Sequence, residues 1–454
     1  MILRPSTSAE RFVVLAAAIL LAVFLWFFSI RGAWAAHFAT VTNATGLQRA
    51  TRLEPGNAEY WYLLGRYWQF NLEDPDNDKA VSAYRNSLSF DSHSAETYID
   101  LATAYEGLDD IAQARDNFLK AKKAYPLSAE VSWRVGNFYL RQGELELAFA
   151  QIRESVQADP SRGAEAFSRC LRVEPNIKTV LALALPDSPE VYLDIIHGLS
   201  DERRTTDALI VWDRLAAMRP SFPLVEVSPL INALREKQEI VDAARVWKQA
   251  VEFAGMERLG DPADSVLWNG GFESGFHNFG YAWFYDNNMR SVQVQLDHSE
   301  KHSGAQSLRL TFDGGSDITF ADVCHPVPVL PLVDYKLSVW VQTRDLSSDQ
   351  GLRLRIQTSG PGSALAFTSE IHGTQPWTEL EIPWTAGAGV REAQVCIARL
   401  PSDQPDNRIR GTAWVDDVSL IPQSAPQVDS KAGGETSGRA RPSGRGKPSG
   451  NTRP

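Results

Sequence analysis

The sequence is poor in the residues from which catalytic and metal centres are built. It has three cysteines in 454 residues, without a CxxC pair, and its eight histidines are scattered without an HExxH motif. These absences argue against a zinc site and a thioredoxin-like redox centre. A nucleophile elbow, a Walker loop and a dinucleotide-binding fingerprint are missing too. Neighbouring aspartates at 109–110 and 416–417 point apart and do not form a glycosidase pair. We therefore expect no enzymatic activity and no required cofactor.

An excess of basic charge is also absent. The formal net charge is −11 and the pI is about 5.3, so we expect the bulk of the chain to repel nucleic acid. Hydrophobic residues make up 43% of the sequence, which is enough for packed cores, and the length suggests roughly two to four domains.

One long apolar run lies near the N-terminus. Residues 12–30 contain no charge and no proline, and a helix of this length spans roughly the 30 Å hydrocarbon core of a bilayer. We predict a transmembrane helix. Arg4 and Arg11 before it, with Arg31 after it, weakly favour a cytoplasmic N-terminus and place the rest of the chain outside the cytoplasm. The competing interpretation is a cleaved signal peptide, because residues 33–35 (Ala-Trp-Ala) have the small-x-small form of a cleavage site.

The middle of the chain repeats with a period of 34 residues, which is typical of helical solenoids. Weaker copies surround two strong ones, the register breaks between 163 and 189, and roughly five to six repeats fit between 44 and 258. The recurring positions are Ala102, Tyr105, Ala114 and Pro126, followed by Gly136, Tyr139, Ala148 and Pro160.

The residue types at these positions resemble the tetratricopeptide repeat. That resemblance implies pairs of antiparallel helices and a concave groove lined by the first helix of each pair. The groove residues for which we predict binding of a protein or peptide partner are Tyr62, Arg66, Trp133, Asn137 and Arg141. The alternative is that these are solvated surface residues.

After Gly260 the pattern changes to short alternating runs separated by Gly, Pro and Asn. Several short strands of this kind indicate an antiparallel β-sandwich. The predicted strands are 291–296, 307–312, 335–343, 352–358, 378–382, 393–398 and 412–420.

Three segments of this β region resemble jelly-roll carbohydrate-binding modules with a galactose-binding-like fold: NGGFE at 269–273, HSGAQSLRL at 302–310 and WVDDVSL at 414–420. The resemblance implies a jelly roll and a polysaccharide as a candidate ligand. Stacking on a sugar ring needs aromatic side chains, and the candidates are Tyr281, Trp283, Tyr285 and Trp340. The alternative for each is packing in the core.

The same resemblance implies a structural calcium ion that joins the opening and closing motifs. Its carboxylate ligands would be Glu273 and either Asp416 or Asp417, completed by backbone carbonyls near 302–304. Because side chains alternate along a strand, only one of the two aspartates can face the ion, and the parity that Asp416 shares with Trp414 favours Asp416. The alternative is that the carboxylates cap backbone amides without a metal.

Two of the three cysteines, Cys324 and Cys396, lie in this β region, which we place in an oxidising compartment. A disulfide between them is therefore a candidate, and two buried thiols are the alternative. Cys170, between poorly matched repeats, is expected to stay free.

The predicted class is multidomain α + β. Its parts are a cytoplasmic stub and transmembrane anchor (1–36), a tetratricopeptide solenoid (44–258), a β-sandwich (262–422) and a basic tail (423–454). Six basic and two acidic residues leave the tail at +4, and its composition predicts disorder. We expect a membrane-anchored extracytoplasmic scaffold, and analogy alone suggests exopolysaccharide assembly. The alternative is a purely structural assembly protein whose β domain binds no sugar.

Overall fold

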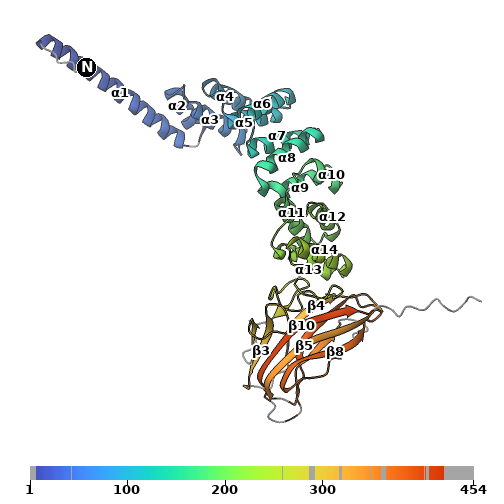
Figure 1. The fold of residues 1–454 in the computed structure, drawn as a ribbon. Helices are drawn as coiled ribbons and strands as arrows, with labels where there is room; N and C mark the ends of the chain where they lie inside the picture. The colour runs from blue at the N-terminus through green and yellow to red at the C-terminus, as the bar shows by residue number, and fades with distance from the viewer. Residues whose placement is uncertain are drawn as a thin grey trace, which may run out of the picture. The chain divides into compact units, whose positions relative to one another are not determined.

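A computed structural model of the chain describes residues 7–41, 43–257, 259–285, 292–315, 320–347, 349–358, 365–402, 404 and 408–423. Its contacts divide it into two compact units, residues 1–237 and 238–454. The predicted class is confirmed, because helices are followed by two antiparallel sheets (Figure 1). The tail for which we predict disorder lies outside the described residues, except for Gln423. Arg4 also lies outside them.

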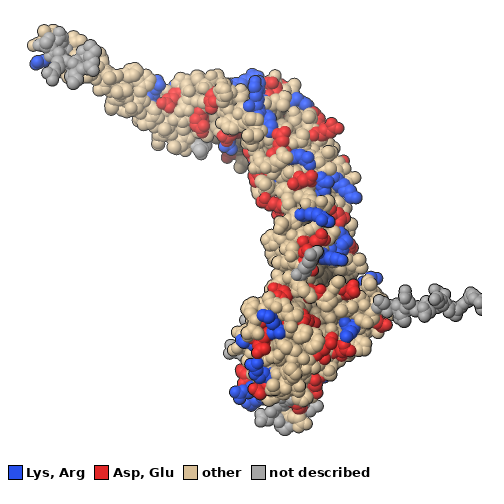
Figure 2. All heavy atoms as spheres, in the orientation of Figure 1, with Lys and Arg blue, Asp and Glu red and all other residues tan. Residues whose placement is uncertain are grey.

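The first unit begins with one long apolar helix, α1 (Ser8–Thr40), which continues ten residues beyond the predicted run. Its most apolar stretch is fully exposed, and its length and composition are compatible with either a membrane span or a signal sequence. In Figure 2 the described part of the helix has a long stretch without any charged side chain.

The C-terminal third of α1 packs against the first helix of the repeats. α2 (Ala44–Leu53) is capped by Asn43, whose Oδ1 accepts a hydrogen bond from the Gly46 amide at 2.7 Å. Gly46 lies so close to α1 that a Cβ there would be 2.7 Å from the carbonyl oxygen of Phe38. Ala35 of α1 and Ala50 of α2 are fully buried. The two helices therefore form a tightly packed hairpin.

The remaining helices of this unit follow in antiparallel pairs. They are α3 (Ala58–Phe70), α4 (Asn77–Phe90), α5 (Ala95–Gly107), α6 (Ile111–Ala124), α7 (Ala129–Gln142), α8 (Leu145–Ala158), α9 (Gly163–Leu171), α10 (Ile177–Leu183), α11 (Pro189–Asp201), α12 (Thr205–Ala217) and α13 (Ser228–Glu236). α9 and α10 have only nine and seven residues. They form the distorted repeat that the broken register predicted.

Small residues set the spacing within each pair. A Cβ on Gly65 of α3 would lie 2.5 Å from the ring of Tyr84 on α4, and one on Gly136 of α7 would lie 2.8 Å from the side chain of Ile152 on α8. Only glycine allows these helices to approach so closely. The repeat motif therefore marks the helix crossings.

Among its described residues, the second unit contains α14 (Ile240–Phe253) and the strands β1 (Phe284–Tyr285), β2 (Val292–Asp297), β3 (Ser307–Asp313), β4 (Phe320–Pro328), β5 (Asp334–Ser347), β6 (Arg353–Gln357), β7 (Leu365–Phe367), β8 (Gly373–Thr385), β9 (Glu392–Arg399) and β10 (Arg410–Pro422). They form two five-stranded sheets in the orders β1-β4-β9-β6-β7 and β2-β3-β10-β5-β8. Strands β3, β10, β5 and β8 of the second sheet lie side by side in Figure 1. Buried apolar side chains from both sheets form one core.

α14 is packed on the β-sandwich through Trp247. The ring centroid of Trp247 lies 5.4 Å from that of Trp268, 5.9 Å from that of Phe279 and 6.3 Å from that of Tyr281. A Cβ on Gly280 would lie 2.4 Å from the Trp247 ring. This helix therefore belongs to the β unit, although its repeat pattern assigned it to the solenoid.

Candidate functional site

Two adjoining hollows lie along the first helices of the repeats. The first, of about 510 Å³, is lined from α3, α5 and α7 and contains Tyr62 and Arg66. The second, of about 780 Å³, is lined from α5, α7 and α9 and contains Trp133, Asn137 and Arg141. All five predicted partner-binding residues therefore line these hollows, which share the side chains of Glu130 and Arg134.

The first hollow is built around a half-buried carboxyl group. The Tyr62 hydroxyl donates a hydrogen bond to Asp100 Oδ2 at 3.1 Å, and Arg66 Nε lies 3.7 Å from the same oxygen. Burial raises the pKa of Asp100, and the pKa of Tyr62 is raised by burial and by the nearby charges of Glu96 and Asp100. Tyr62 is thus held in the wall of the hollow rather than standing free in solvent.

The second hollow is held together by contacts between successive repeats. The guanidinium groups of Arg162 and Arg169 lie 5.5 and 5.1 Å from the ring centroid of Trp133. Arg169 Nη1 also donates to Asn137 Oδ1 at 2.9 Å, and Asn137 Nδ2 donates to the Trp133 carbonyl at 2.8 Å. Asn137 is 7% exposed. Two of its hydrogen bonds are thus made within the protein, and its role in binding a peptide stays a prediction.

Arg141 is the predicted groove residue best placed to meet a partner. Its side chain is 51% exposed, and its Nε and Nη2 each donate to the Glu106 carboxylate at 2.7 Å. A bidentate pair of this kind fixes the guanidinium plane. Glu106, Arg162 and Arg169 were missed by sequence analysis, although their partners lie 32–35 residues away, close to the repeat period.

Two of the four predicted glycan-binding aromatics are buried in the β unit. Tyr281 is 1% exposed and Trp283 is 0% exposed. The Trp283 ring is stacked on Phe272 at 4.7 Å, and its Nε1 donates to the Asn269 carbonyl at 2.8 Å. A sugar cannot reach either ring, so the predicted glycan contact at these two positions is wrong. Tyr285, on β1, is half-buried and packs against Phe276 at the edge of the core.

Trp340 remains a candidate for contact with a ligand. It is half-buried on β5, and the ring of His302 lies flat on it at 4.0 Å with an interplanar angle of 11°. Trp377, half-buried on β8, meets His302 edge-on at 5.7 Å. Sequence analysis missed Trp377. Glu379 of β8 lies opposite Trp340 of β5 in the register, and Trp377 comes two residues before Glu379. Because side chains alternate along a strand, Trp377 lies on the same face of the sheet as Trp340.

The carboxylates predicted to bind calcium are occupied by the loop at 302–305. Glu273 Oε1 accepts from the Ala305 amide at 2.8 Å, and Asp416 Oδ2 accepts from the His302 amide at 2.8 Å. His302 Nδ1 lies 2.6 Å from Asp417 Oδ2. Burial, together with the charge of Asp417, raises the pKa of Asp416 to about 6.

This arrangement fits amide capping better than metal binding. Among the described residues, no group of three or more His, Cys, Asp or Glu side chains is placed to hold a metal. The calcium ion stays a prediction. Melting curves with and without EDTA test it, since an ion at a hundred times its Kd would add about 2.7 kcal/mol.

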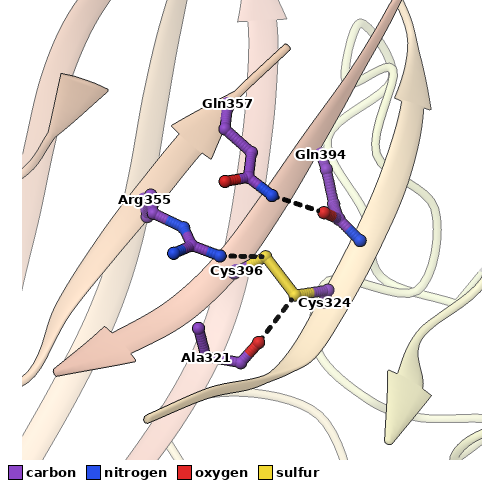
Figure 3. The surroundings of a disulfide bond; sticks show 6 residues. All are labelled: Ala321, Cys324, Arg355, Gln357, Gln394 and Cys396. Atoms are coloured by element: carbon purple, nitrogen blue, oxygen red, sulfur yellow. Dashed lines mark hydrogen bonds between the residues drawn. A yellow bond between two sulfur atoms is a disulfide. The ribbon is translucent and has the colours of Figure 1, made fainter. Parts of the chain in front are cut away.

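The two cysteines of the β unit form a disulfide. Cys324 of β4 and Cys396 of β9 are directly opposed in the register, with Cα atoms 4.1 Å apart. Figure 3 shows Arg355 of β6 directed at this bridge, its Nη2 lying 3.7 Å from the sulfur of Cys396. Cys170 is free and buried, as expected.

Comparison with known proteins identifies the repeats. Residues 99–163 match the family model of the tetratricopeptide repeat. The general transcriptional corepressor ssn6 of Schizosaccharomyces pombe is 27% identical over 145 residues, which cover 27% of this chain and 13% of that protein. The chain thus spans a small part of the length of this relative. YrrB, a TPR protein with an unusual peptide-binding site, is 14% identical with a TM-score of 0.25, covering 47% of this chain and 95% of YrrB.

The β unit has similar solved structures as well. TmCBM61 in complex with β-1,4-galactotriose is 19% identical with a TM-score of 0.25, covering 35% of this chain and 99% of that one. Family 16 carbohydrate-binding module 2 is 14% identical, also with a TM-score of 0.25, covering 34% of this chain and 99% of that one. The chain combines tetratricopeptide repeats with a β-sandwich of two antiparallel sheets.

Proposed function

We propose that the chain is a membrane-anchored, non-enzymatic scaffold that binds protein or peptide partners in the groove of its repeats. The observation that carries this proposal is the pair of adjoining hollows, whose charged side chains are fixed by contacts between repeats. Groups that are ordered before binding lose little entropy when a partner docks. A groove of this kind suits an extended or helical peptide.

The charges of the hollows suggest the chemistry of the partner. The first hollow has four carboxyl groups and two arginines, whereas the second has three arginines and two glutamates. A peptide with a basic side chain at one end and an acidic side chain at the other complements this polarity.

A matched pair of arginine variants tests the groove. Arg141 of the second hollow and Arg214 of α12 both bind a carboxylate in bidentate fashion, and their side chains are 51% and 44% exposed. Full-length protein in detergent is panned against a random peptide library displayed on phage. Arg141→Ala is expected to lose the enriched peptides, while Arg214→Ala, outside both hollows, keeps them. Equal enrichment by both variants would overturn the proposal.

The packing of α1 supports an anchor rather than a cleaved signal peptide. Cleavage after Ala35 would remove a fully buried residue from the α1–α2 hairpin. We therefore propose that α1 stays on the mature chain, with the N-terminus in the cytoplasm and the bulk of the chain outside it.

The β unit is proposed to dock a glycan on the face that carries Trp340 and Trp377. The ring of His302 covers one face of Trp340, and the parts of the two half-buried tryptophans that stay exposed offer apolar surface of the kind that stacks on sugars. Affinity electrophoresis of the full chain in gels that contain different polysaccharides tests this proposal. Retardation is expected for the native protein and not for the Trp340→Ala variant. The absence of retardation in every gel would favour the alternative, a purely structural β domain. It would also argue against a role in exopolysaccharide assembly.

A further inference from the structure

We infer that the corner between α2 and α3, residues 54–61, rests in the headgroup region of the membrane that α1 spans. The inference goes beyond the proposed function, but it rests on the anchoring of α1. The occupant of this surface is thus the lipid bilayer itself.

α2 runs back towards the end of the apolar run. A Cβ built on Gly32 of α1 would lie 3.0 Å from Glu54 Oε1 at the C-terminal end of α2. Gly32 comes two residues after Ile30, the last residue of the run, which is about 3 Å along a helix axis. The corner therefore lies at the level where the hydrocarbon core gives way to headgroups.

The residues of the corner suit that environment. Tyr60 and Trp61 are half-buried there, and Trp34 of α1, four residues beyond Ile30, is 57% exposed. Tyrosine and tryptophan are enriched at both edges of a bilayer because their rings are partly apolar and partly polar. Arg52, exposed on α2, adds a positive charge that can pair with anionic lipid.

The packing holds the corner in this position. Phe38 of α1 and Val41 just after the helix lie against Gly46, and Ala39 packs against the cluster that contains Leu47 and Leu64. The helix that spans the membrane is thus joined to the first repeat through a packed hairpin. The opposite end of α3 lies roughly 20 Å further along that helix, and Leu72 just beyond it is 99% exposed.

Single spin labels test the inference in the full chain. The native cysteines do not compete for the label, because Cys324 and Cys396 are bridged and Cys170 is fully buried, with its pKa raised by burial to about 12. Gly56 is exposed and an added Cβ there meets nothing within 4 Å. Gly56→Cys and Leu72→Cys are each labelled with a nitroxide and reconstituted into phosphatidylcholine–phosphatidylglycerol vesicles.

The label at 56 is expected to be several-fold less accessible to a water-soluble nickel relaxation agent than the label at 72. Equal accessibility in protein that floats with the vesicles would overturn this inference and leave the proposed anchor intact. Protein that does not float would overturn both. If the Gly56 variant does not fold, Glu59→Cys, which is also exposed within residues 54–61, gives the same comparison.

Discussion

At the scale of single residues, Asn137 and Arg141 lie one helical turn apart but contribute differently to stability. Asn137 is buried and hydrogen-bonded to Trp133 and Arg169, whereas Arg141 is half-exposed and paired with Glu106. Asn137→Ala removes both of these hydrogen bonds from a buried site, although Arg169 keeps its bonds to Glu165. With about 0.5–1.5 kcal/mol for each bond, the variant is expected to destabilise the repeats by about 1–3 kcal/mol. Arg141→Ala is expected to cost less than about 1 kcal/mol. Urea unfolding followed by circular dichroism measures both, and equal losses would contradict this assignment.

Asp297 makes the β unit sensitive to acid. It is 8% exposed, and it accepts hydrogen bonds from the Ser299 amide at 2.9 Å and from Trp414 Nε1 at 2.9 Å. Burial alone would raise its pKa, but the hydrogen bonds from Ser299, Trp414 and the Glu300 amide outweigh burial and lower it.

The sign of the pH dependence follows from that lowered pKa. The folded protein holds the carboxylate ionised more readily than the unfolded chain does, so its stabilisation is complete above about pH 4 and is lost as the pH falls. Asp297→Asn is expected to destabilise the β unit by about 1–3 kcal/mol at neutral pH and to flatten the acid side of its stability curve. Melting temperatures from pH 3 to 7 provide the measurement. If the melting temperature of the variant falls at low pH as steeply as that of the native protein, Asp297 is not the source of the acid sensitivity.

At the scale of elements, α14 is expected to be required for the stability of the β unit. The predicted boundary at 262 would remove this helix and expose Trp268 and Tyr281. In the full chain, Trp247→Ala is expected to lower the stability of the β unit by about 3–5 kcal/mol, because it empties an aromatic site that is 6% exposed in the native protein. Near-ultraviolet circular dichroism during urea unfolding reports this loss. A fragment 238–423 that melts no higher than a fragment 262–423 would show that the helix is dispensable.

The disulfide joins β4 to β9, which are far apart in sequence. It closes a separation of 72 residues, and loops of this size are stabilised by about 2–4 kcal/mol when they are cross-linked. Reductant is expected to lower the melting temperature of the native protein and of Cys170→Ala, but not that of the Cys324→Ala/Cys396→Ala double variant. If reductant leaves the melting temperature of the native protein unchanged, the disulfide does not stabilise the β unit.

The elements that sequence analysis found and missed have physical reasons. The β5 and β8 strands alternate apolar and polar residues, so the pattern predicted them. β4 was missed because Pro326 and Pro328 interrupt its pattern. Among the described residues, β1 pairs with β4 only at residues 323 and 324 of β4. The two prolines lie beyond this pairing, so the backbone N–H that each proline lacks is not needed for a hydrogen bond to β1.

At the scale of the whole molecule, the repeat period located the groove but could not assign roles to its residues. The period gives the helix and the face on which a side chain lies, whereas burial of Asn137 depends on Arg169 from the distorted repeat. In the β unit, the local sequence around Trp283 is compatible with either a core or a surface position. Its burial is decided by contacts with Phe272 and His325, which only the folded chain brings together.

The orientation of the whole chain is open to one direct test. With α1 as an anchor and Arg11 on its cytoplasmic side, protease added to right-side-out membrane vesicles is expected to remove a C-terminal tag and to leave an N-terminal tag protected. Inverted vesicles give the control, since the two tags should exchange their behaviour. Loss of the N-terminal tag from the mature chain, with release of the protein by alkaline carbonate, would establish a cleaved signal peptide. The α1–α2 hairpin argues against that outcome, because the segment removed includes Ala35, which is fully buried in the native protein.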